Sequence, residues 1–145
     1  MRISSFLVIC LMFLLTSCDL YTGSFVVNSS SEKITIDIKY NQNNEMIEKY
    51  VKHHNGFEGF VKFIRDYYNS SKGNLIKMDS SKYTATIELN KKDTLRIWGG
   101  IHQSNDFDEI EEIVIRSNKK QTTIKGEDFQ DVFDKNGSVY IYTVQ

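Results

Sequence analysis

The stretch KITIDIKY, residues 33–40, decides the fold class of this chain. Ile34, Ile36, Ile38 and Tyr40 alternate in it with polar residues. Successive side chains of a β-strand point to opposite faces of the sheet, so this alternation predicts a strand with one buried face and one face in water. The polar segment after it, residues 41–44, is typical of a turn.

Similar segments recur along the chain, separated by polar turns. A strand is expected to begin at 25–27, before the stretch above, and further strands are predicted at 83–89, 94–98, 111–116, 121–125 and 138–144. Gly99-Gly100 is expected to end the strand at 94–98, and Asn136-Gly137 is a turn pair. This spacing favours a mostly β fold, an antiparallel β-sandwich. The alternative is an α+β fold with a helix packed on one antiparallel sheet.

One segment, near 56–69, has the period of a helix instead. Asn55 with Glu58 three positions later forms a capping box, and Glu58, Lys62 and Asp66 follow at intervals of four along a polar face. The opposite face carries the apolar side chains of an amphipathic helix, namely Phe57, Phe60, Val61, Ile64, Tyr67 and Tyr68. Residues 128–133 predict a single helical turn.

Residues Glu45 to His53 fit two structures, a second hairpin strand or a helical turn. The four-residue loop before this segment suits a β-hairpin, so we expect a strand.

The N-terminus has the pattern of a secretory signal peptide. Arg2 is followed by the uncharged apolar run 6–15, which is shorter than the roughly 20 residues that span a bilayer. The next positions, Leu15-Thr16-Ser17-Cys18, are an aliphatic residue, two small residues and a cysteine. This pattern resembles the lipobox of bacterial lipoproteins at all four positions.

The resemblance implies a defined maturation. Signal peptidase II would cleave between Ser17 and Cys18, and Cys18 would carry acyl chains that hold the protein in a membrane. Two or three long chains anchor a protein stably, whereas one binds only marginally. We therefore expect a cleaved signal peptide at 1–17, a lipidated cysteine with a short tether at 18–23, and one strand-rich domain at 24–145. In layout, this arrangement resembles the small immunoglobulin-like lipoproteins of bacterial envelopes.

Composition narrows the classes of partner. The 18 basic and 19 acidic residues give no bias toward nucleic acid, so we expect none as a partner. Cys10 would leave with the signal peptide and Cys18 would be blocked by lipid, which leaves the expected domain without a disulfide.

Side chains that bind metals or catalyse reactions form no recognisable motif. His53, His54 and His102 lack metal-ligand spacing, and the acidic stretch 105–112 lacks the pattern of a calcium loop. The aromatic residues Trp98, Tyr140 and Tyr142 suit either a ligand surface or a core. We therefore expect no catalytic residue, metal or cofactor.

The sequence leaves three functions open. The favoured one is a lipid-anchored protein of the bacterial cell envelope, in the outer or inner membrane, that acts without catalysis as a binding, accessory or assembly component. Its expected partners are the membrane, through Cys18, and another envelope protein. The alternatives are a periplasmic inhibitor or immunity protein against a toxin or hydrolase, and an envelope hydrolase that uses carboxylates.

Overall fold

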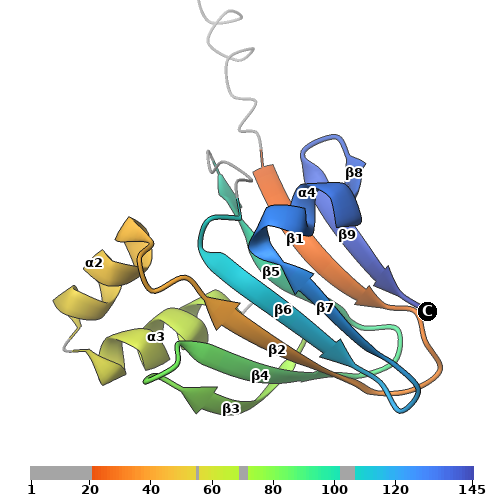
Figure 1. Ribbon diagram of the computed structural model, residues 1–145, viewed down its shortest axis with the longest axis horizontal. Helices are drawn as coiled ribbons and strands as arrows, with labels where there is room; N and C mark the ends of the chain where they lie inside the picture. The colour runs from red at the N-terminus through yellow and green to blue at the C-terminus, as the bar shows by residue number, and fades with distance from the viewer. Residues whose placement is uncertain (1–20, 55, 69–71, 102–106) are drawn as a thin grey trace, which may run out of the picture.

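A computed structural model describes residues 21–54, 56–68, 72–101 and 107–145, and it is mostly β (Figure 1). The elements follow in chain order: β1 (Tyr21–Asn28), β2 (Ile34–Tyr40), α2 (Glu45–His53), α3 (Phe57–Tyr68), β3 (Asn74–Asp79), β4 (Thr84–Leu89), β5 (Thr94–Ile101), β6 (Ile110–Arg116), β7 (Gln121–Lys125), the 3-10 turn η1 (Gly126–Asp128), α4 (Phe129–Val132), β8 (Asp134–Asn136) and β9 (Val139–Val144).

The strands form two sheets. The five-stranded sheet has the order β3-β4-β2-β6-β7 and is antiparallel throughout. The four-stranded sheet has the order β5-β1-β9-β8, and in it β1 and β9 run parallel. The predicted purely antiparallel arrangement is therefore wrong for this pair. Parallel neighbours cannot be joined by a tight hairpin, and nearly the whole chain separates β1 from β9.

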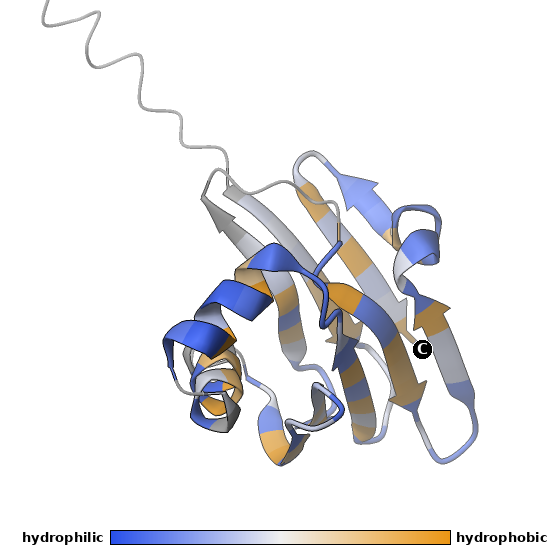
Figure 2. Ribbon diagram, turned by 60° about the vertical axis from the view of Figure 1, so that its left-hand side comes forward, coloured by the Kyte–Doolittle hydropathy of each residue, from blue (hydrophilic) through white to orange (hydrophobic). Residues whose placement is uncertain are grey.

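The strand alternation read from residues 33–40 is confirmed. Ile34, Ile36, Ile38 and Tyr40 are each at most 1% exposed, and the residues between them are only half-buried. Figure 2 shows the same alternation as bands of hydrophobic and hydrophilic residues along the strands. Buried residues of both sheets, such as Val26 and Ile36, belong to one hydrophobic core cluster.

The amphipathic helix predicted near 56–69 is present as α3. Its buried face carries Phe60, Phe63 and Ile64, and the rings of Phe60 and Phe63 meet Tyr40 edge-on at 5.9 and 5.5 Å between centroids. Phe63 was not assigned to the apolar face from sequence. Asn55, the predicted cap, lies outside the described residues.

The strand expected at Glu45–His53 is wrong, because these residues form α2. Asn44 caps this helix: its side-chain oxygen accepts hydrogen bonds from the backbone N–H groups of Met46 at 3.0 Å and Ile47 at 3.2 Å. Two ion pairs at i,i+4, Glu45 with Lys49 and Glu48 with Lys52, follow the outer face. Ile47 is its buried residue, and α2 packs chiefly against α3. The structure therefore has two amphipathic helices, α2 and α3, whereas the sequence analysis predicted only the one near 56–69.

One strand was not predicted from sequence, and the end of another was predicted wrongly. Residues 74–79 form the edge strand β3, which lacks alternation because a bulge interrupts its pairing with β4 between Leu75 and Lys77. β5 continues through Gly99 to Ile101 rather than ending at the glycines. Gly99 has φ +144°, and a Cβ there would lie 2.5 Å from the Thr22 carbonyl oxygen. Glycine thus allows β1 and β5 to approach closely instead of ending the strand.

A buried asparagine, Asn28, joins the loops at one end of both sheets. Its side-chain amide donates hydrogen bonds to the carbonyls of Glu32 at 2.8 Å, Leu89 at 3.2 Å and Asn90 at 3.1 Å. Its side-chain oxygen accepts from the backbone and the hydroxyl of Ser30, at 3.1 and 2.6 Å. Asn28 is 0% exposed, so these hydrogen bonds replace water for its own side chain.

Candidate functional site

The predicted lipobox, Leu15 to Cys18, lies outside the described residues, so its proposed cleavage and acylation rest on sequence. The described part of the chain begins at Tyr21, which is already the first residue of β1. β1 therefore includes residues 21–23 of the segment expected to be a tether at 18–23. Between Cys18 and the first strand, only Asp19 and Leu20 intervene.

Within the described ranges, no helix has both the length and the apolar character needed to cross a bilayer. The same part of the chain holds no group of three or more His, Cys, Asp or Glu side chains arranged to bind a metal ion. His53 and His54 lie at the end of α2, where the His54 ring contacts the Tyr50 ring in a tilted arrangement, with 4.9 Å between centroids. His102 is outside the described residues.

The structure contains an open cleft of about 720 Å³, which we call the acidic cleft. One wall is the segment Phe107 to Glu111 before and within β6, and the other is the segment Lys125 to Asp131 across η1 and α4. Four carboxylates line it, contributed by Asp108, Glu111, Glu127 and Asp131.

The floor of the acidic cleft is aromatic. The Phe107 ring is 1% exposed and packs against Phe129, Phe133 and Tyr140 at 5.0, 5.7 and 5.5 Å between centroids. Phe107 adopts φ +55°, a conformation that bulky side chains rarely take, and its carbonyl accepts a hydrogen bond from Ile110 at 2.9 Å. Tyr140 and Phe129 are thus parts of the core rather than ligand contacts.

The carboxylates of this cleft are poorly suited to acid catalysis. All four side chains belong to exposed residues, and Glu111 is paired with Lys39 at 2.5 Å. A general acid in glycoside hydrolysis needs a carboxyl group shielded from water, so that it stays protonated near neutral pH. The arrangement is better suited to attracting cations or basic groups than to proton transfer.

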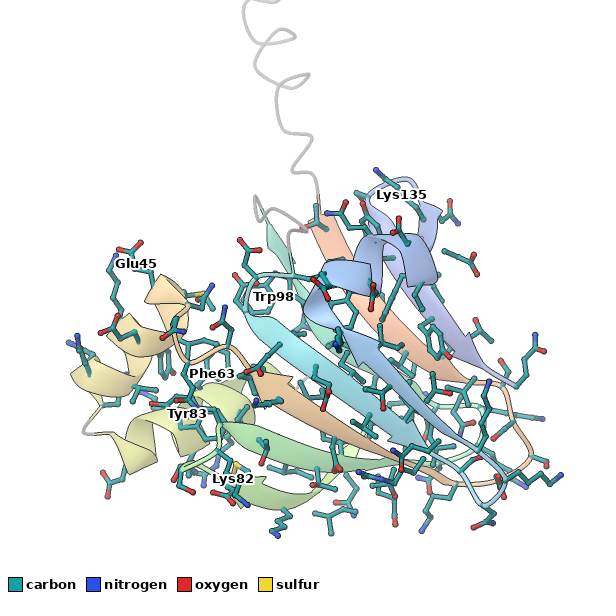
Figure 3. All side chains as sticks on the ribbon, in the orientation of Figure 1. Glu45, Phe63, Lys82, Tyr83, Trp98 and Lys135 are labelled. Atoms are coloured by element: carbon teal, nitrogen blue, oxygen red, sulfur yellow. The ribbon has the colours of Figure 1, made fainter. Side chains whose placement is uncertain are left out.

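Trp98 occupies the core. It is 2% exposed, on β5 next to the glycines that approach β1 (Figure 3). Of the two readings of this residue from sequence, the core is the one observed.

No protein-family model, no curated protein and no solved structure matches this chain.

Sequence reasoning found half of the acidic cleft. It singled out the acidic stretch 105–112, of which residues 107–112 are described, but it did not connect this stretch with Glu127 and Asp131. A usable signal was present, because the strands predicted at 111–116 and 121–125 are separated by only four residues. Strands joined by so short a turn pair as a hairpin, which brings the residues after 125 beside those before 111.

Proposed function

We propose that this protein is a lipid-anchored lipoprotein of the bacterial cell envelope, and that its domain acts as a non-catalytic binding or accessory component. The observation that carries the proposal is the complete lipobox at Leu15 to Cys18, followed almost at once by the first strand at Tyr21. Acyl chains on Cys18 would then hold a folded domain at the membrane and raise its effective concentration for its neighbours.

The short connection constrains how the domain would stand on the bilayer. Three Cα–Cα steps separate Cys18 from Tyr21, and a fully extended chain spans about 11 Å in three steps. The start of β1 would therefore face the lipid. The β8–β9 hairpin lies at the same end, because Gly23 donates a hydrogen bond to the Ser138 carbonyl at 3.3 Å and Lys135 projects there (Figure 3).

For the fold, we propose that the two sheets are the layers of an immunoglobulin-like β-sandwich. The shared core cluster supports this arrangement, since it combines Val26 and Leu95 of the four-stranded sheet with Ile36 and Ile113 of the five-stranded sheet. Loops gathered at both ends of such a sandwich are common positions for binding surfaces.

The anchor is tested by metabolic labelling with a clickable palmitate analogue in a bacterial host. Wild type and Cys10→Ala should both carry the label, whereas Cys18→Ala should carry none. Cys10→Ala is the matched control, because it removes the other cysteine of the chain without touching the lipobox. Equal labelling of Cys18→Ala and wild type would refute the proposal.

The acidic cleft favours one second candidate, a carboxylate-dependent hydrolase. It brings Glu127 and Asp131 to the same hollow as Asp108 and Glu111. Exposure of all four side chains argues against this activity, for the reason given above. Hydrolysis of envelope polysaccharide by wild type, abolished in Glu127→Gln or Asp131→Asn, would establish it over the non-catalytic function.

A further inference from the structure

Three loops meet at the end of the domain opposite the start of β1. They connect β1 to β2 at residues 29–33, β4 to β5 at 90–93, and β6 to β7 at 117–120. In Figure 1 these loops lie at the right, beside the C-terminus, whereas β1 begins at the top. β1 has eight residues, so this end lies about 25 Å from Tyr21 along the strand.

Hydrogen bonds hold the three loops together. The Asn28 amide reaches Asn90 in the second loop, and the backbone N–H of Lys92 donates to the Asn28 carbonyl at 2.7 Å. Glu32 in the first loop accepts from the backbone and the side chain of Asn118 in the third loop, at 3.1 and 2.6 Å. The loop surface is thus preorganised, which lowers the entropic cost of binding a partner.

Four exposed lysines project from two of these loops, namely Lys91, Lys92, Lys119 and Lys120, and we call this surface the basic pole. Among the ion pairs found in the described ranges, none includes these four residues. Lys33, in the first of the three loops, pairs with Glu88, and Lys39, Lys49 and Lys52 each pair with a glutamate in other parts of the domain. The three loops together contain five lysines and two carboxylates, Glu32 and Asp93, so this end of the domain has an excess of positive charge.

The backbone at Lys92 has an unfavourable conformation for a lysine. Its φ is +64°, in the left-handed region that glycine and asparagine occupy more easily. A glycine at residue 92 would adopt this conformation more easily. Tyr83 and Phe107 also have positive φ, so the conformation is not confined to the basic pole.

A small groove adjoins the basic pole. It has a volume of about 200 Å³ and is lined in part by Lys120 and by the half-buried side chains of Tyr142 and Val144. Charged groups at the rim of an interface increase the association rate and the specificity, whereas a side chain seated in a pocket supplies most of the affinity. The basic pole and the groove together have both features.

We propose that the basic pole binds an acidic protein segment that places an apolar or aromatic side chain in the groove. The direction of this surface, away from the bilayer, rests on the proposed anchor at Cys18. The protein's own bilayer is a poor partner, because about 25 Å is well beyond the screening length of roughly 8 Å in physiological salt. Lysine ammonium groups are compact point charges, which suits attraction to carboxylates spread along a segment.

The test uses full-length mature protein extracted in non-ionic detergent and two soluble probes, poly-L-glutamate and a random copolymer of glutamate and tyrosine. The copolymer should bind about fivefold more tightly than poly-L-glutamate, because its aromatic side chains can enter the groove. Replacing the four lysines of the basic pole with glutamine should weaken binding of the copolymer at least about tenfold and reduce its salt dependence. Circular dichroism confirms that the variant is folded.

A matched variant replaces four exposed lysines away from this end, Lys49, Lys72, Lys77 and Lys82, with glutamine. It has the same net charge as the first variant and should bind like wild type. Equal weakening in both variants, equal affinity for the two polymers, or no binding of either polymer would overturn the proposal. So would equally tight binding to phosphatidylglycerol vesicles that depends on the same four lysines, since the partner would then be lipid. These outcomes are independent of acylation at Cys18, which palmitate labelling reports separately.

Discussion

Asn28→Ala should destabilise the domain more than any other asparagine substitution tested in it. The change removes three side-chain hydrogen bonds to the carbonyls of Glu32, Leu89 and Asn90 and two that Ser30 donates. A hydrogen bond of this type contributes roughly 1 kcal/mol, and a buried partner left unsatisfied costs roughly 1–3 kcal/mol. Ser30 is half-buried and can turn to water, so we expect a loss of about 3–4 kcal/mol.

Urea denaturation followed by tryptophan fluorescence measures this loss, because the buried Trp98 is the single tryptophan of the chain. With an m-value of about 1.5–2 kcal/mol per molar, the midpoint should fall by roughly 2 M urea. Asn41→Ala is the control. Asn41 also donates to a carbonyl, that of Asp108 at 2.9 Å, but this bond is solvent-exposed, so its loss should cost less than about 1 kcal/mol. Equal midpoints for the two variants would refute the role assigned to Asn28.

Three further predictions concern the backbone and one carboxyl group. Gly99→Ala should destabilise the domain by about 2–4 kcal/mol in the same urea assay, because the new Cβ would meet the backbone of β1. Gly137→Ala is the control and should cost only about 1 kcal/mol, because nothing lies within 4 Å of the new Cβ. Equal losses would contradict the close approach of β1 and β5. Lys92→Gly should raise the free energy of unfolding by about 0.5–1 kcal/mol by relieving the positive φ, and a decrease would argue against that strain. The Ser81 hydroxyl donates a hydrogen bond to the Asp79 carboxylate at 2.6 Å and holds the pKa of that carboxyl below its usual value. This interaction therefore stabilises the fold above about pH 4, and the stabilisation is lost as the pH falls through the lowered pKa. Ser81→Ala should raise the pKa of Asp79 in a carboxyl NMR titration, and an unchanged pKa would show that the hydroxyl has no such effect.

Strands with strict alternation were predictable from sequence. Residues 34–40 form β2 at the centre of its sheet, and one face of this strand is buried against the core. The alternation of apolar and polar residues in the sequence therefore matches the alternation of buried and half-buried side chains. Residues 74–79 have no such pattern, because an edge strand with a bulge needs no continuous apolar face, and Ile76 in it is 54% exposed.

Residues 45–53 contain helix signals that the strand prediction did not use. Met46, Ile47, Tyr50 and Val51 recur at helical spacing, and Asn44 before them is a favoured N-cap residue, whereas the prediction rested on the length of the preceding loop. Two i,i+4 charge pairs in the sequence also favoured a helix.

The acidic cleft and the basic pole depend on tertiary structure. Glu111 and Asp131 are far apart in sequence and meet only because β6 pairs with β7 and the chain then turns through η1 and α4. Lys91 lies in the loop that crosses from one sheet to the other between β4 and β5, whereas Lys119 lies in the β6–β7 hairpin turn. The hydrogen bonds of Asn28 and Glu32 that join these loops have no signature in the sequence.

Intact-mass analysis of the protein purified from bacterial membranes tests the central claim of anchoring most directly. We predict a polypeptide that begins at Cys18 and is heavier than its sequence by a diacylglyceryl group, with or without a third acyl chain. A polypeptide that retains residues 1–17 and an unmodified Cys18 thiol would contradict the anchor and the membrane location derived from it.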